Sequence, residues 1–192
     1  DMVYNHMMNT VNMDNIVPGY YFRSDYLGRY TNGSGCGNEL ASERPMVRKF
    51  IIDSCLHWIK DYKIDGIRFD LMELLDIDTT KEIVKKTTKL DKNFLIYGEP
   101  WKGGSSPLVN GTYKGSQKNE NFSIFNDTFR DAIRGNNHPS SGFINGNQYS
   151  SICNWSIIEG LKGSIYTITS NPNESINYVD AHDNYTLWDQ VE

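Results

Sequence analysis

Several features that define specialised classes of protein are scarce in this chain. Its 192 residues include only three cysteines, an odd number at distant positions, and no Cys-x-x-Cys or Cys/His spacing typical of a metal site. No run of basic residues exceeds two and the net charge is -5, which disfavours a nucleic-acid or anionic-membrane partner. No apolar stretch approaches the roughly 18 residues of a membrane span, and no signal peptide is visible.

The chain begins with Asp1 rather than Met, and its first residues already have the pattern of a strand that is ending. We therefore expect a fragment that is incomplete at both ends, so the missing signal peptide leaves a secreted and a cytoplasmic location equally open. Hydrophobic residues make up 38% of the chain and charged residues 22%, an ordinary globular profile. The length suffices for a sizeable core.

Helical patterns occur in four segments. Residues 45–62 carry apolar side chains at helical spacing behind a proline suited to the first turn; the stripe is Val47, Ile51, Cys55, Trp58, Ile59 and Tyr62. Cys55 is therefore expected in the core. Residues 79–82 (TTKE) have the signature of a capping box that starts a helix running to about residue 89. Further helices are predicted over 127–135, closed by Gly135, and around 151–163.

Strand patterns alternate with these helices, and two loops rich in Gly, Ser and Asn fall at 15–42 and 102–121. The predicted strands are residues 1–6, 63–71, 94–101, 121–127 and 176–184. This alternation predicts an α/β fold with parallel strands, in which functional groups gather at the carboxyl ends of the strands. Four of those ends carry chemistry-bearing residues: Asn5-His6, Arg68 with Asp70, Glu99, and His182-Asp183.

Three carboxylates at three strand ends are costly to bury without a purpose, because ionised groups lose hydration there. Carboxylates that converge split their pKa values, and that split suits a general acid beside a carboxylate nucleophile. Arg68 lies two residues before Asp70, so strand alternation places both side chains on one face. A lone Asp at a strand end is more often a cap or a loop hydrogen-bonder. The joint, ordered occurrence of these motifs favours a catalytic site.

The motifs also carry a family resemblance. The segments DMVYNH, DGIRFDLM, YGEPW and YVDAHDN resemble, in order, the four shared regions of the α-amylase superfamily. Flanking stretches, among them VPGYYFR, NELASERPMVRKFIIDS and FNDTFRDAIRG, are similar to type I pullulanases. The resemblance implies part of a (β/α)8 TIM barrel, roughly strands three to seven with their helices. Residues 1–192 would then form a partial catalytic barrel domain.

The resemblance also implies roles for individual residues. Asp70 matches the family nucleophile, Glu99 the general acid/base, and Asp183 the carboxylate that stabilises the transition state. Six further positions match residues around the bound sugar, some of them largely structural: His6, Arg68, His182, Trp101, Asn5 and Asp1. Glu73 departs from the family pattern, because many pullulanases have a small residue there. We assign no residue to a metal, although calcium in the complete protein stays open.

The implied reaction is hydrolysis of α-1,6-glucosidic branch linkages in pullulan, starch or glycogen-type α-glucans by a retaining double displacement. Water is the second substrate, so no organic cofactor is expected, and the partner is a neutral α-glucan. Two alternatives stay open: an isoamylase- or α-amylase-like hydrolase, and a non-catalytic carbohydrate-binding barrel. Five of eight strands cannot close a barrel, so we expect residues 1–192 alone to be insoluble or inactive.

Overall fold

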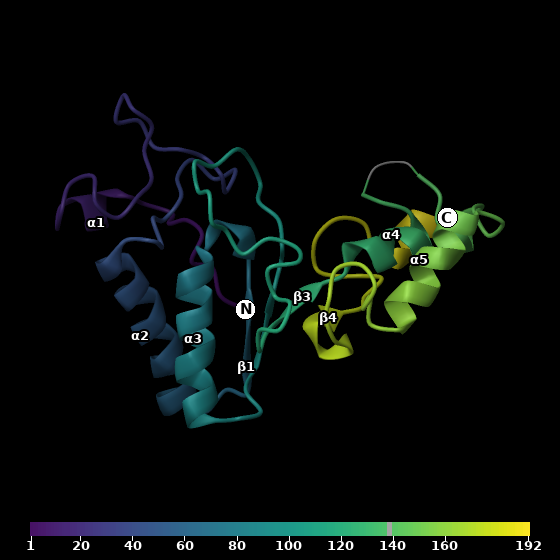
Figure 1. The fold of residues 1–192 in the computed structure, drawn as a ribbon. Coiled ribbons are helices and arrows are strands. Elements are labelled where there is room, and N and C mark those ends of the chain that lie inside the picture. Colours follow the sequence, from purple (N-terminus) through teal and green to yellow (C-terminus); the bar gives the residue numbers. More distant parts are fainter. Residues whose placement is uncertain (138–139) are drawn as a thin grey trace. The chain divides into compact units, whose positions relative to one another are not determined.

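The computed structural model describes residues 1–137 and 140–192. The chain divides into two compact units, Asp1–Phe122 and Ser123–Glu192, and each is described by itself (Figure 1). Both units combine helices with parallel strands, which confirms the predicted α/β class. Within the described residues, none of the helices is both long and apolar enough to span a membrane.

The first unit is built on a parallel strand pair. Strand β1 (Gly66–Phe69) pairs with β2 (Leu95–Gly98) in a register that sets Phe69 opposite Gly98. On the other side of β1, Met2 forms a single parallel bridge to Phe69. The predicted strand over residues 1–6 is therefore reduced to one bridge, while the two central strand predictions are confirmed in shorter form. Strand β1 therefore has a hydrogen-bonded neighbour on each side: β2 on one and the bridge at Met2 on the other.

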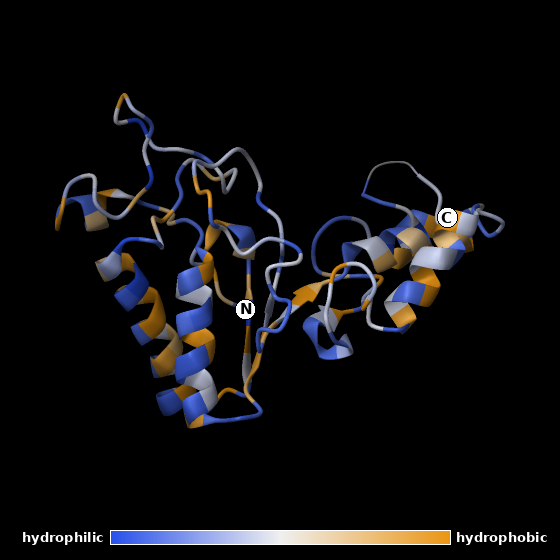
Figure 2. Ribbon diagram, viewed as in Figure 1, coloured by the Kyte–Doolittle hydropathy of each residue, from blue (hydrophilic) through white to orange (hydrophobic). Residues whose placement is uncertain are grey.

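Helix α2 (Pro45–Tyr62) has the predicted bounds and lies beside α3 (Ile77–Leu90) in Figure 1. Four members of the predicted stripe are buried, and Ile52 joins them; the buried set is Val47, Ile51, Ile52, Cys55 and Ile59. Tyr62 is instead 61% exposed and packs against Trp58, with ring centroids 4.6 Å apart and the ring planes tilted by 45°. Figure 2 shows both hydrophobic and hydrophilic residues along α2 and α3, as expected for helices with one buried face.

The predicted N-cap of α3 at Thr79 is wrong by three residues. Asp76 is the N-cap, and its Oδ1 accepts a hydrogen bond from the Thr79 backbone N–H at 3.0 Å. An aspartate is a strong N-cap because its carboxylate satisfies a free N–H at the positive end of the helix dipole. Two short helical turns complete this unit: α1 (Val11–Asp14) and η1 (Met72–Leu74), the latter directly after β1.

The second unit pairs β3 (Ser123–Phe125) with β4 (Ser175–Ile176) in parallel. Its helical elements are α4 (Asp127–Arg134), η2 (Phe143–Asn145), α5 (Ser151–Leu161), η3 (Pro172–Glu174) and α6 (Leu187–Val191). The Asn126 side chain caps α4 by accepting from the Phe129 N–H at 3.1 Å, and Gly135 ends it at φ +87°. Both α4 and α5 were predicted from sequence.

The predicted strand over 176–184 is wrong beyond Ile176. The Asn177 amide donates to the Gly160 carbonyl at 2.8 Å, and the Asp180 carboxylate accepts from the Ala181 and Leu187 N–H groups. Such side-chain bonds to backbone compete with a strand ladder. Asn184 lies in the left-handed region at φ +66°, which ends any extended conformation.

Cys55 provides a test of this core. The thiol lies 1% exposed in α2, and Tyr4 packs nearby, donating to Ser54 Oγ at 2.7 Å. Burial raises the pKa of Cys55 to about 12. Because the thiolate is the reactive form, we predict that Cys55 resists iodoacetamide at pH 8 in the folded chain while the exposed Cys36 is alkylated. Equal rates at the two positions, followed by peptide mass spectrometry, would contradict this packing.

Candidate active site

The Arg68 guanidinium is the centre of a cluster of carboxylates at the carboxyl end of β1. Its Nη1 lies 2.8 Å from Asp1 Oδ1 and 3.1 Å from Asp70 Oδ1, and its Nη2 lies 2.5 Å from Glu99 Oε1. Strand alternation explains the placement, because Ile67 is buried on the opposite face. The structure thus brings three predicted site residues, Asp1, Asp70 and Glu99, around the planar cation of a fourth.

Glu99 is held at both oxygens and is 3% exposed. Besides the contact of Oε1 with Arg68, its Oε2 accepts from the backbone N–H of Leu71 at 2.8 Å. Leu71 adopts φ +40°, a left-handed conformation that is strained for a side chain of this kind. The left-handed turn at Leu71 directs its backbone N–H toward Glu99. The strained residue therefore links the end of β1 to the end of β2.

Gly98 permits the close approach of the two strand ends. A Cβ at this position would lie 2.7 Å from the Phe69 carbonyl oxygen and 2.6 Å from Met72 Sδ. No side chain fits that space without moving the backbone of β1. The glycine therefore lets Glu99, the next residue, reach the same guanidinium as Asp70.

Asp70 is fixed from two sides. Arg68 binds Oδ1, and the Asn5 amide Nδ2 donates to Oδ2 at 2.8 Å and to the Asp70 carbonyl oxygen at 3.1 Å. Asn5 is fully buried, whereas the Asp70 side chain keeps 23% of its surface exposed. The carboxylate is therefore oriented by the protein and still reachable from outside.

His6 joins the same network through Asn5. Its Nδ1 lies 2.6 Å from Asn5 Oδ1, which extends a continuous polar chain from His6 through Asn5, Asp70 and Arg68 to Glu99. The link between Asn5 and Asp70 spans 65 residues of sequence. Sequence reasoning selected all five residues, yet only the fold shows that they are bonded to one another.

Trp101 and Glu73 lie on the segments that follow the two strands. Trp101 is half-buried, two residues after Glu99. The next residue, Lys102, pairs with Glu73 at 2.9 Å and so ties the η1 turn to the segment after β2. Glu73, which departs from the family pattern, thus has an ion-pair partner in Lys102.

His182 and Asp183 belong to the second unit. Their side chains are 60% and 59% exposed, and His182 Nε2 lies 3.5 Å from Asp183 Oδ1. They occupy a bend and not the end of a strand, as described above. Their convergence with Asp70 and Glu99 stays a prediction.

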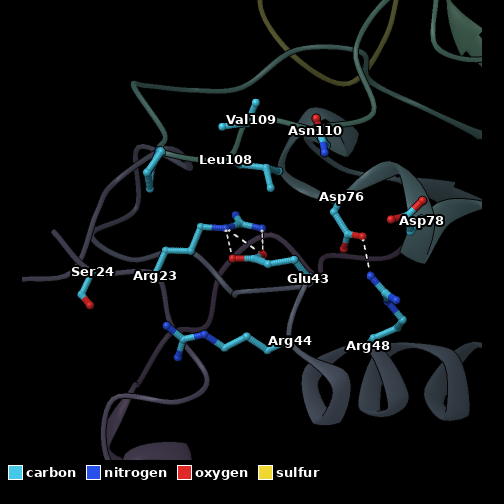
Figure 3. A pocket seen from close by; sticks show the side chains of 11 residues that line it. Arg23, Ser24, Glu43, Arg44, Arg48, Asp76, Asp78, Leu108, Val109 and Asn110 are labelled. Atoms are coloured by element: carbon cyan, nitrogen blue, oxygen red, sulfur yellow. Dashed lines mark hydrogen bonds and ion pairs between the residues drawn. The ribbon is translucent and has the colours of Figure 1, made fainter.

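A separate cavity of about 370 Å³ lies in the first unit (Figure 3). It is lined by Arg23, Ser24, Glu43, Arg44, Arg48, Asp76, Asp78, Pro107, Leu108, Val109 and Asn110. Arg23 binds Glu43 at 2.7 Å and the buried Glu39 at 3.0 Å, and Arg48 binds Asp76 at 2.8 Å. These charges neutralise one another in pairs. We therefore interpret the residues around the cavity as a structural ion-pair network. Sequence reasoning gave Arg23 and Glu39 no role, since they lie in a predicted loop.

Outside 138–139, no group of three or more His, Cys, Asp or Glu side chains is placed to hold a metal ion. The carbonyl oxygen of the Asn5 side chain, the atom that a hard cation would need, is bound to His6.

Comparison with known proteins places this arrangement in context. The chain is 39% identical over 203 residues to a pullulanase of Bacillus subtilis strain 168 and 32% identical over 254 residues to the chloroplastic pullulanase 1 of Arabidopsis thaliana. The pullulanase structure from Bacillus acidopullulyticus matches all of the chain with a TM-score of 0.94 at 44% identity, covering 24% of that structure. A pullulanase from Anoxybacillus sp. LM18-11, solved with maltotriose, matches with a TM-score of 0.91 at 41% identity, over 99% of this chain and 28% of that one. No protein-family model matches the chain.

In sequence and in fold, the whole chain is similar to one segment of these pullulanases. The comparisons support a fragment of a type I pullulanase, as the motifs predicted. The match covers the whole chain, which spans about a quarter of the length of these relatives: 28% of the Bacillus subtilis protein and 26% of the Arabidopsis protein.

The central role of Arg68 leads to a stability prediction. Replacing Arg68 by Met leaves three carboxylates without their shared cation, so the free energy of unfolding should fall by about 3–5 kcal/mol, measured by urea denaturation. The matched control is Arg29→Met, which removes an exposed ion pair with Asp25 and should lower the same quantity by less than about 1 kcal/mol. Similar losses in the two variants would show that the cluster does not depend on Arg68.

Proposed function

We propose that this chain supplies catalytic residues of a retaining glycoside hydrolase that cleaves α-1,6-glucosidic branch linkages in pullulan, starch or glycogen-type α-glucans. The observation that carries the proposal is the binding of Asp70 and Glu99 to one guanidinium at adjacent strand ends. Two carboxylates set together on rigid elements are what a retaining glycosidase needs. The names of the relatives and the maltotriose in one matching structure support the substrate class.

In the proposed reaction, Asp70 attacks the anomeric carbon and forms a glycosyl ester while the C–O bond to the leaving glucan breaks. Glu99 gives its proton to the departing O6 oxygen in the same step. Glu99 then takes a proton from water, whose oxygen attacks the anomeric carbon and releases the Asp70 carboxylate. Two inversions give net retention, and a carboxyl separation of about 5–5.5 Å suits this route. No organic cofactor enters the scheme.

The remaining site residues are proposed to act on the sugar. His6, exposed in part beside the network, would hydrogen-bond a hydroxyl of the reacting glucose, and Trp101 would stack on a sugar face. Asp183 and His182 would bind hydroxyls of the same glucose and stabilise the transition state. Arg68 would hold the two reacting carboxylates in register.

We further propose that the strands belong to a (β/α)8 barrel. The bridge at Met2 would belong to the third strand, and β1 to β4 would be the fourth to the seventh. In such a barrel the active site forms at the carboxyl ends of the strands, where Arg68, Asp70 and Glu99 lie. Residues 1–192 would then be one part of a larger catalytic domain.

The catalytic proposal is tested in the full-length protein. The wild type should release maltotriose from pullulan and leave amylose intact, whereas an α-amylase-like enzyme would cleave amylose.

Asp70→Asn should lower kcat by about 10⁴-fold, since an amide cannot act as the nucleophile. Asp78→Asn, an exposed carboxylate eight residues later, is the matched control and should leave the rate unchanged. An Asp70→Asn variant with wild-type activity would show that the site is not used, and a wild type that binds pullulan without cleaving it would indicate a purely carbohydrate-binding barrel.

The barrel proposal makes a separate prediction for the isolated chain. Residues 1–192 expressed alone should hydrolyse no pullulan, because an open sheet leaves edges and interior surface in water. A reducing-sugar assay beside the full-length protein at equal molar concentration measures this. Turnover by the isolated chain would refute the need for further strands.

A further inference from the structure

Asn5 has an environment unlike that of a substrate-binding residue. It is fully buried, and both ends of its amide are engaged by protein atoms. Its two neighbours in the network, His6 and Asp70, both keep some exposed surface. A side chain in this position reaches a bound sugar only through those two neighbours.

The contacts of Asn5 also fix the hydrogen positions around it. One end of the amide faces the Asp70 backbone carbonyl oxygen, which only accepts hydrogen bonds, so that end must be the NH2 group. The same NH2 group donates to Asp70 Oδ2. The other end is therefore the carbonyl oxygen, and the His6 Nδ1 that lies 2.6 Å from it must carry a hydrogen.

We propose that Asn5 is a positioning residue that couples the nucleophile to the histidine beside it, an inference that rests on the proposed hydrolase function. Through its NH2 group Asn5 sets the plane of the Asp70 carboxylate, and through its carbonyl oxygen it keeps the hydrogen of His6 on Nδ1. Neutral His6 then has its lone pair on Nε2, which accepts a hydrogen bond from a donor such as a sugar hydroxyl. One buried amide thus sets both the direction of attack and the polarity of a substrate contact.

Two substitutions separate these two effects in the full-length protein. Asn5→Asp keeps an oxygen acceptor for His6 but turns an oxygen toward Asp70, so the nucleophile loses its donor. Asn5→Ala removes both contacts. Both variants should lower kcat by about 100-fold, because small displacements of a reacting group have effects of that size. Only Asn5→Ala should also release the histidine from the Nδ1–H form.

The matched control is Asn38→Asp. Asn38 is also a buried amide and bonds Met7, donating to its carbonyl at 2.7 Å and accepting from its N–H at 3.0 Å, but it touches none of the proposed catalytic residues. This variant should lose stability and keep the wild-type kcat and KM below its melting temperature. A loss of kcat in the control equal to that in the Asn5 variants would mean that buried amides here act only through stability.

The position of the histidine hydrogen is read by long-range ¹H–¹⁵N NMR on protein labelled at histidine, with the His6 signals assigned by His6→Gln. The expected result is the Nδ1–H form in the wild type and in Asn5→Asp. An Nε2–H form in the folded wild type would overturn the proposal even if neither Asn5 variant folds, and wild-type kcat in both variants would overturn it as well. If the wild type cleaves no pullulan, the hydrolase proposal fails, and the NMR result alone still decides the link between Asn5 and His6.

Discussion

The interaction on which the candidate site depends is the buried guanidinium of Arg68. A rigid, permanently charged fork can bind carboxylates in several directions at once, and here it contacts Asp1, Asp70 and Glu99. Burying the Glu99 charge alone would be strongly unfavourable, so this carboxylate requires the cation, whereas the Asp1 side chain stays 51% exposed. The shared cation gathers groups from three distant parts of the sequence at one end of β1.

The backbone around Arg68 is shaped to permit this gathering. The parallel register of β1 and β2 sets their ends level, Gly98 lets the strands approach closely, and the left-handed Leu71 turns its N–H toward Glu99. Asn5 completes the arrangement from the N-terminal segment, which a bridge at Met2 attaches to β1. Fold and site are therefore specified by the same contacts, and a change at any of these positions alters both.

Local patterns in the sequence were sufficient where one signal dominated. Helix α2 followed from its proline and apolar spacing, and the shared face of Arg68 and Asp70 followed from strand alternation. Local signals failed where two competed: Thr79 with Glu82 mimics a capping box, yet Asp76 caps the helix. The apolar and aromatic residues of 176–184 suggested a strand, but the turn-forming bonds of Asn177 and Asp180 prevail. The bond between Asn5 and Asp70 spans 65 residues, and no local pattern encodes it.

The most direct test of the account is to trap the covalent intermediate. The full-length protein is incubated with a fluorinated α-glucosyl fluoride that forms the glycosyl ester faster than water removes it, and the labelled peptide is sequenced by mass spectrometry. We predict one fluorinated glucosyl group on Asp70, within the segment IDGIRFDLM. A label on Glu99 or Asp183, or turnover with no covalent label, would contradict it.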